Sequence, residues 1–265
     1  MGETVAKIRA FLAVNLSVPV TRAIAELQGA LRQGIPRELR VAWVPPANLH
    51  LTIKFLGPTE PEAAAAIADT LATALEKTPP CEVRARGAGA FPDPRRPRVL
   101  WVGLEDPSGG LAGVHRVVED RMADLGFARE ERPFSPHLTL GRVKDGHADV
   151  TALLATTAER QLGTSIVREI VLYESRLRAQ GAEYVALRRV PFGGRSPERP
   201  AEAPPLRVPA PPSGEISADG ARPDASQGRA SSSIDASQGR ASSIDAPGPG
   251  PADPDPETEK TDHGS

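Results

Sequence analysis

The chain has 265 residues, a formal net charge of −2 and one cysteine. That cysteine, Cys81, excludes an intramolecular disulfide and is typical of a reducing compartment. No apolar run approaches the roughly 20 residues that a membrane-spanning helix needs. The short run at residues 10–14 is better explained as a strand than as a signal peptide. We therefore expect a cytoplasmic protein that does not bind membranes.

Strands and helices are expected to alternate along the first 192 residues. A strand over residues 8–16 precedes a helix over 18–33, whose aliphatic residues recur at helical spacing. Two strands over 40–44 and 49–56 follow, separated by the Pro45-Pro46 turn. The sequence Thr59-Glu60-Pro61-Glu62 has the pattern of a capping box for a helix that reaches about Lys77.

The second half is expected to repeat this order. Strands over 82–90 and 98–104 precede a helix over 110–125. A strand over 135–143, a weaker helix over 150–161 and two strands over 165–173 and 183–190 complete the series. The repetition indicates an internal duplication, and two similar lobes related by a pseudo-twofold axis would then share a cleft.

The composition changes sharply after Phe192. Residues 193–265 contain no aromatic residue, 13 of the 28 prolines, 7 basic and 12 acidic residues. A nine-residue sequence, Asp-Ala-Ser-Gln-Gly-Arg-Ala-Ser-Ser, begins at Asp224 and again at Asp235. Such a segment cannot bury enough apolar surface to offset the entropy of ordering. We expect a folded domain over 1–192, whose net charge of +3 permits a polyanionic partner, and a disordered tail over 193–265.

One four-residue pattern occurs twice, as His50-Leu51-Thr52-Ile53 and as His137-Leu138-Thr139-Leu140. On a strand, this alternation places the His and Thr on one face and the aliphatic residues on the other. An imidazole can give or take a proton near neutral pH, and a threonine hydroxyl can donate a hydrogen bond to an anion. One copy alone would be typical of any half-exposed strand. Two copies, if brought face to face, supply the groups for in-line attack at phosphorus without a metal.

The longer sequences around these motifs resemble a known family. They are Asn48 to Gly57, Phe91-Pro92 followed by Pro97 to Trp101, Pro136 to Arg142, and Leu172 to Ser175 followed by Gly181 to Tyr184. From Arg9 to about Phe192 the chain is similar to the RNA 2′,3′-cyclic phosphodiesterases, also called 2′-5′ RNA ligases, of the two-histidine phosphoesterase superfamily. The tail has no counterpart in that pattern.

The resemblance implies a fold, a reaction and a set of residues. The fold would be α+β, with two similar lobes, antiparallel sheets flanking a central cleft and helices outside. The reaction would be hydrolysis of RNA 2′,3′-cyclic phosphate to a 2′-phosphomonoester, with no metal or other cofactor. Matched to the motifs, His50 would be the proton donor and His137 the proton acceptor, while Thr52 and Thr139 would bind the phosphate oxygens.

Arg142 is the nearest cation to the second motif. The resemblance makes it a contact to phosphate or RNA, and we include it as a phosphate-binding candidate. Strand alternation instead directs it away from His137 and Thr139, as a solvated strand end, unless Gly141 permits a bulge. Strand alternation would place Lys54 on the same face as His50 and Thr52. Lys54 is equally consistent with a residue at the edge of the strand, so it is left out of the site.

Several other residues are expected to have structural roles. His115 is predicted to be a partly buried helix residue, and Asp145, His147 and Asp149 are too few ligands in one turn to close a metal site. Arg95, Arg96 and Arg98 form a loop that is either solvated or in contact with an RNA backbone. Trp43, Trp101 and Phe134 are candidates for the core, although one of them could stack on a base.

Three functions remain open at this point. The first is hydrolysis of cyclic phosphate on RNA or an oligonucleotide, by a monomer. The second is reversible 2′-5′ RNA ligation or cleavage of 2′-5′ oligonucleotides, which would use the same four residues. The third is a non-catalytic nucleotide-binding scaffold, against which two intact motifs argue.

Overall fold

The computed structural model describes residues 6–178 and 181–194. The tail predicted to be disordered lies outside this part, except for Gly193 and Gly194. The helices and strands follow in the order β1 (Ile8–Val14), α1 (Val18–Gly34), β2 (Arg40–Trp43), β3 (Leu51–Thr59), α2 (Ala63–Leu75), β4 (Cys81–Phe91), β5 (Val99–Glu105), α3 (Gly110–Asp124), β6 (His137–Asp145), α4 (Thr151–Ala155), β7 (Gln161–Val167), β8 (Glu169–Arg178) and β9 (Gly181–Pro191).

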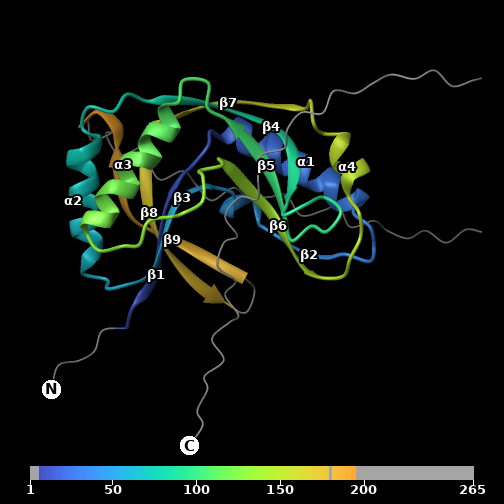
Figure 1. Ribbon diagram of the computed structural model, residues 1–265, viewed down its shortest axis with the longest axis horizontal. Coiled ribbons are helices and arrows are strands. Elements are labelled where there is room, and N and C mark those ends of the chain that lie inside the picture. Colours follow the sequence, from blue (N-terminus) through green and yellow to red (C-terminus); the bar gives the residue numbers. More distant parts are fainter. Residues whose placement is uncertain (1–5, 179–180, 195–265) are drawn as a thin grey trace, which may run out of the picture. The chain divides into compact units, whose positions relative to one another are not determined.

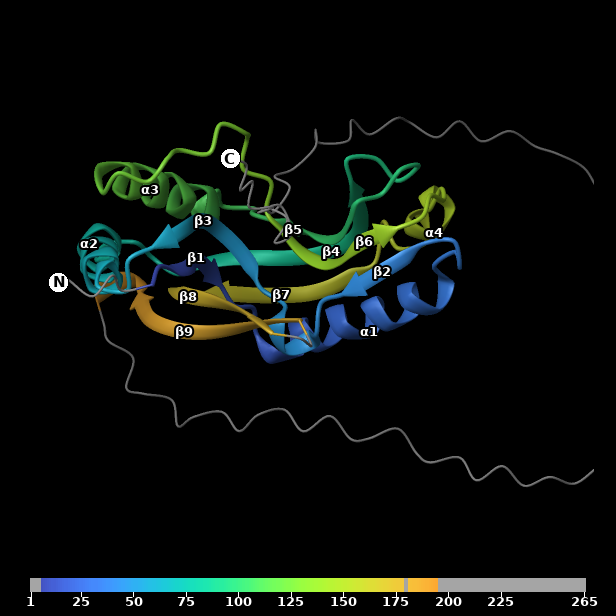
Figure 2. The same cartoon turned by 90° about the horizontal axis from the view of Figure 1, so that it is seen from below.

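The described strands form one curved antiparallel sheet (Figure 2). Its order is β7-β4-β5-β6-β3-β1-β8-β9, and β2 pairs with β6. Strands β6 and β3 meet at a single recorded pair, Leu51 with Leu138, so the sheet nearly divides there. We call β3, β1, β8 and β9 the first lobe, and β6, β5, β4, β7 and β2 the second lobe. The expected two-lobed α+β fold is confirmed.

The helices lie in two groups at opposite ends of the sheet (Figure 1). Helix α1 follows β1 of the first lobe but packs on the second, where Ser17 N donates to Ser165 Oγ of β7 at 2.8 Å. Its Gln28 Nε2 donates to Leu140 O of β6 at 2.8 Å. Helix α3 follows β5 of the second lobe and packs on β3 of the first. Each of these helices therefore ties one lobe to the other.

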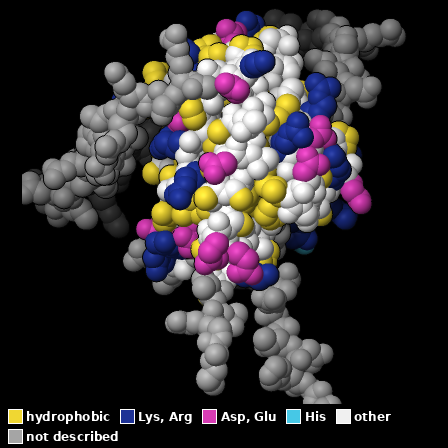
Figure 3. Space-filling view, turned by 90° about the vertical axis from the view of Figure 1, so that its left-hand side faces the viewer, with side chains coloured by type: hydrophobic (Ala, Val, Ile, Leu, Met, Phe, Trp, Pro, Cys, Tyr) yellow, Lys and Arg dark blue, Asp and Glu magenta, His cyan; other side chains and the backbone are white. Residues whose placement is uncertain are grey.

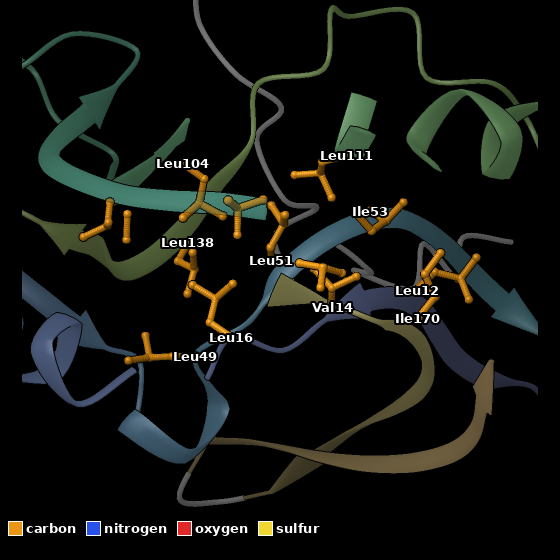
Figure 4. Close-up of a cluster of buried hydrophobic side chains, with 14 of the residues drawn as sticks. Leu12, Val14, Leu16, Leu49, Leu51, Ile53, Leu104, Leu111, Leu138 and Ile170 are labelled. Carbon is orange, nitrogen blue, oxygen red and sulfur yellow. The ribbon is translucent and has the colours of Figure 1, made fainter. Parts of the chain in front are cut away.

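One hydrophobic core crosses the junction between the lobes. Leu51 is 1% exposed and Leu138 is fully buried. Figure 4 shows both in a cluster with Val14 of the first lobe and Leu104 of the second. Burial of apolar area is the dominant favourable contribution to folding, so a core shared by both lobes holds them together. The residues that join the motif strands are thus also part of the core.

Three local expectations are wrong. The single strand predicted over 165–173 is two strands, because the chain leaves β7 in the second lobe and enters β8 in the first. The helix predicted over 150–161 ends at Ala155, and the hydroxyl of Thr157 beyond it is buried between Leu154 O at 2.8 Å and Ala88 N at 3.1 Å. Thr59 caps no helix, since it ends β3 and donates its hydroxyl to Gly57 O at 3.1 Å.

The described surface is mixed in character. No helix in this part of the chain is both long and apolar enough to cross a bilayer. On the face that Figure 3 shows, acidic and basic side chains are interspersed with small hydrophobic groups. Exposed ion pairs such as Lys7 with Glu60, at 3.2 Å, are of a kind that contributes little to stability.

Candidate active site

The two motifs meet where the lobes join. His50 directly precedes β3, His137 begins β6, and the Leu51–Leu138 pair lies between the two strands. Successive residues of a strand point to opposite faces, and the burial follows this rule. Both leucines are buried, whereas His50, Thr52, His137 and Thr139 are half-buried on the other face. The expected alternation of the motifs therefore holds in both strands.

The two imidazoles are held in the same way. His50 Nδ1 lies 2.7 Å from Asn48 O, and His137 Nδ1 lies 2.7 Å from Ser135 O. A carbonyl oxygen only accepts, so each Nδ1 carries the proton, and the Nε2 of a neutral ring is left as an acceptor. His50 Nε2 lies 3.1 Å from Thr52 Oγ1, whose hydroxyl can donate to it. Neutral in this tautomer, either ring can take up a proton at Nε2.

Aromatic rings from other strands of the sheet pack against both imidazoles. The His50 ring meets the edge of Tyr184 at a centroid distance of 5.1 Å and lies 5.0 Å from Phe11. The His137 ring meets Phe91 at 5.0 Å in a T-shaped arrangement. Trp101, expected in the core, is half-buried with its ring 6.4 Å from His137. The rings limit rotation of the imidazoles and remove water from one side of each.

This environment favours the neutral form of both histidines. Burial lowers the pKa of His50 to about 4, against an opposing effect of the Asn48 hydrogen bond, and the positive charge of Arg142 lowers it further. Burial also lowers the pKa of His137, again with a raising effect of its carbonyl partner Ser135 and a lowering effect of Arg142. At neutral pH both imidazoles are therefore uncharged in the absence of a ligand.

A bulge in β6 brings Arg142 to the site. On the paired strand β5, Trp101 is opposite Thr139 and Leu100 is opposite Gly141, so Leu140 is an extra residue. One extra residue reverses the alternation that follows it. Arg142 consequently shares the face of His137 and Thr139, which agrees with its effect on the pKa of both histidines. The simple alternation rule, which directed Arg142 away from the site, does not apply beyond the bulge.

Strand β3 has a bulge at the equivalent motif position. Leu12 is opposite Lys54 and Ala13 is opposite Thr52, so Ile53 is the extra residue. Lys54 thereby points to the buried side of the sheet, where its exposure is 5%. Phe55, 37% exposed, takes the place on the site face that Arg142 has in the second motif. Phe55 is not among the site residues expected from the sequence, because no residue type near Ile53 indicates a bulge.

A cavity of about 250 Å³ opens directly beside the site. Its walls come from β3, α3, the segment between α3 and β6, and His137 itself. The lining residues are Thr52, Ile53, Lys54, Phe55, His115, Glu119, Ala128, Arg129, Glu130, Arg132, Pro133, Phe134, Ser135 and His137. The cavity therefore connects residues of both motifs with cationic and aromatic side chains.

Other titratable and cationic residues either have structural roles or lie outside the proposed site. His115 of α3 is half-buried and stacks on Phe134 at 4.1 Å. Within residues 6–178 and 181–194, no group of three or more His, Cys, Asp or Glu side chains is arranged to hold a metal ion. Cys81 is buried, and burial raises the pKa of its thiol to about 11. Arg95, Arg96 and Arg98 lie in the loop between β4 and β5, outside the site.

Comparison with known proteins assigns the chain to a family. The sequence profile of the 2′-5′ RNA ligase superfamily matches residues 21–178, which include both motifs. The chain belongs to this superfamily. This confirms the family membership that the sequence motifs predict.

Two curated relatives resemble the chain over most of their own length. An RNA 2′,3′-cyclic phosphodiesterase of Methanothermobacter thermautotrophicus is 34% identical over 180 residues, which cover 67% of this chain and 95% of the relative. The enzyme of that name from Aquifex aeolicus is 28% identical over 189 residues, 71% of this chain and 98% of its own.

Solved structures share the fold. A protein of Thermus thermophilus superposes with a TM-score of 0.60 at 26% identity, covering 71% of this chain and all of the other. E. coli LigT complexed with 3′-AMP gives a TM-score of 0.58 at 26% identity, over 70% of this chain and 98% of LigT.

Proposed function

We propose that the protein is a phosphodiesterase that opens 2′,3′-cyclic phosphate at the end of RNA and leaves a 2′-phosphomonoester. The observation that carries the proposal is the Leu51–Leu138 pair, which sets two His-x-Thr motifs side by side on one face of the sheet. The curated relatives, named RNA 2′,3′-cyclic phosphodiesterases, support the same reaction.

The two imidazoles would divide the proton transfers. His137 Nε2 takes a proton from water, whose oxygen attacks phosphorus. The bond from phosphorus to the 3′-oxygen breaks, and His50 Nε2 delivers a proton to that oxygen, so the phosphate remains on the 2′-oxygen. General acid and base groups contribute about 10²–10⁴-fold each in such steps.

His50 must be protonated before it can act as the donor. In the ligand-free protein its pKa of about 4 makes the proton scarce at neutral pH. A bound phosphodiester anion would raise that pKa, because an opposite charge within a few ångströms favours the imidazolium. Protonation of His50 is therefore expected to accompany substrate binding.

Thr52, Thr139 and Arg142 would hold the phosphate. Two hydroxyls and one guanidinium on the same face are donors to the non-bridging oxygens, on which negative charge increases during attack. Because these donors are fixed by β3 and β6, they need little rearrangement when the charge develops. The bulge at Leu140 is what brings the guanidinium to this face.

The cavity beside Thr52 and His137 would receive the nucleoside. Phe55 offers an exposed aromatic face there, and stacking of bases on aromatic rings is a general means of binding single-stranded RNA. Arg129 and Arg132 line the same cavity and are suited to the backbone phosphates. A monomeric state and a cytoplasmic location remain predictions from the sequence.

The name of the family supports one of the alternatives, RNA ligation. Reversible 2′-5′ ligation would use the same residues, with an RNA 5′-hydroxyl in place of water as the group that His137 deprotonates. The scaffold hypothesis would use the pocket without the proton transfers.

One product assay tests the proposal and separates the alternatives. An oligoribonucleotide with a 2′,3′-cyclic phosphate end is incubated with the protein in EDTA, with and without a second oligonucleotide that has a 5′-hydroxyl. We expect a 2′-phosphomonoester in both reactions, although EDTA binds any free divalent metal ion. A 2′-5′ joined product would favour ligation, and unchanged substrate would favour the scaffold.

A further inference from the structure

Lys54 has a buried charge beside the first motif and is not used by the proposed chemistry. Its Nζ donates to the Glu119 oxygens Oε1 and Oε2 at 2.9 and 2.8 Å, and to Ala128 O at 2.7 Å. The Lys54 and Glu119 side chains are 3% and 9% exposed. An ammonium group has three protons, so all of its donors are satisfied within the protein.

The ion pair fastens a stretch of chain that has no regular structure. Glu119 Oε2 also accepts a hydrogen bond from Glu130 N at 3.1 Å. Together with Ala128 O, this makes two backbone contacts to residues 128–135, which we call the 128–135 segment. The segment is neither helix nor strand. Its position therefore depends on contacts of this kind rather than on a ladder of backbone hydrogen bonds.

The other end of the segment holds His137. Phe134 stacks on His115 of α3 at 4.1 Å, with an angle of 14° between the rings. The next residue is Ser135, whose carbonyl accepts the Nδ1 proton of His137 at 2.7 Å. The 128–135 segment thus joins the contacts of the Lys54 ion pair near one end to the hydrogen bond of the His137 imidazole at the other.

We propose that Lys54 and Glu119 are positioning residues for His137. They fix the 128–135 segment so that Ser135 O holds the imidazole with Nε2 toward the reacting phosphate. The proposal rests on the proposed function. Stability alone accounts poorly for the pair, because buried ion pairs can often be replaced by apolar residues without loss of stability. In this protein Lys54 also donates to Ala128 O, and Glu119 also accepts from Glu130 N. Both of these hydrogen bonds are made with the 128–135 segment.

His50 provides an internal reference, because it is held independently. Its acceptor, Asn48 O, belongs to a short 3-10 helix over Pro46–Asn48. The Asn48 side chain donates to Ala182 O of β9 at 2.7 Å. Neither of these contacts involves α3 or the 128–135 segment, so loss of the ion pair should leave the His50 ring in place.

The test is the double variant Lys54→Met with Glu119→Leu, which removes both charges and keeps an apolar volume. Three quantities are measured: kcat on the cyclic-phosphate oligonucleotide, the thermal midpoint, and solvent exchange of the two imidazole Nδ1 protons by NMR. We expect a thermal midpoint close to wild type and a kcat about ten- to a hundredfold lower. The Nδ1 proton of His137 should exchange faster, whereas that of His50 should not change.

The matched control removes the exposed pair of Arg121 and Asp124 on the same helix, which lie 3.1 Å apart. Arg121→Gln with Asp124→Asn should leave kcat and both Nδ1 protons unchanged. If the first double variant does not fold, Glu119→Gln replaces it, since the amide keeps one acceptor for Lys54 but weakens the contact to Glu130 N.

Unchanged exchange of the His137 proton in a folded variant would overturn the proposal, whatever happens to kcat. If the wild-type protein itself opened no cyclic phosphate, the proposed function would fail instead. The NMR comparison would still decide whether the ion pair positions His137.

Discussion

Leu51 and Leu138 form the only residue pair recorded between β3 and β6 in the described part of the chain. The pair joins the centres of two copies of one motif, and both side chains lie in the core. The approximate twofold axis that relates the two lobes therefore passes between Leu51 and Leu138. Each lobe contributes one imidazole and one threonine, so the proposed site needs both lobes.

Replacement of Arg142 should weaken binding of the phosphate. In Arg142→Met we expect kcat/KM for the cyclic-phosphate oligonucleotide to fall about tenfold to a hundredfold, because a hydrogen-bonded charge contributes about 1.5–3 kcal/mol. Arg142→Lys should recover part of the loss, since it keeps the charge but not the planar arrangement of donors. Steady-state kinetics of both variants checks this. A wild-type kcat/KM in Arg142→Met would mean that Arg142 does not contact the substrate.

Removal of either threonine hydroxyl should cost less than removal of either imidazole. Thr52→Val and Thr139→Val keep the shape of the side chain and remove one donor, for which we expect a fall in kcat of about tenfold to a hundredfold. Single-turnover rates on the same substrate measure the effect. If the loss equalled that of the histidine variants, the assignment of the threonines to phosphate binding alone would be wrong.

The low pKa of His50 should make the ligand-free protein less stable in mild acid. Its pKa is about 4 when folded and near its ordinary value of 6.5 when unfolded. Between these values the unfolded chain binds the extra proton, so the free energy of unfolding falls as the pH drops below about 6.5. The shift of His137 acts in the same direction.

Urea unfolding from about pH 7.5 to about pH 4.5, in a buffer without phosphate, measures this effect. Wild-type protein should lose more stability over the range than His50→Gln, which has no imidazole to titrate. Added inorganic phosphate should reduce the difference, because a bound anion raises the imidazole pKa. Parallel curves for the two proteins would show that His50 is not desolvated in solution.

Removal of residues 195–265 should leave activity and the thermal midpoint nearly unchanged. The expectation comes from the sequence, since no aromatic residue and few aliphatic ones are available there to extend a core. Differential scanning calorimetry and the cyclic-phosphate assay, on the full chain and on the chain ending at Gly194, check it. A clear drop in the midpoint after truncation would show that the tail stabilises the folded part.

The sequence predicts the motifs, their alternation and the two-lobed plan well, because each depends on local periodicity and on repetition. It does not predict the bulge at Ile53, which no residue type marks, and it offers a bulge near Gly141 only as the alternative to strict alternation in β6. Each bulge reverses the direction that strand alternation predicts for the side chain after it, Lys54 in β3 and Arg142 in β6. The alternation rule therefore holds only up to the bulged residue, which is the fourth of each motif. The division of the strand predicted over 165–173 into β7 and β8 is likewise not marked by any residue type. Arg168 lies between two apolar segments, and no glycine or proline marks the passage from one lobe to the other.

The central claim is that His50 and His137 carry out the proton transfers. The most direct measurement is kcat for opening a cyclic-phosphate oligonucleotide by His50→Ala and His137→Ala, with circular dichroism to show that both variants fold. In each variant kcat should fall at least about 10²-fold, because one of the two proton transfers, from the attacking water or to the leaving oxygen, then lacks its imidazole. His147→Ala, which removes an exposed histidine outside the site, should keep wild-type activity. Near wild-type turnover in either active-site variant would contradict the two-histidine account.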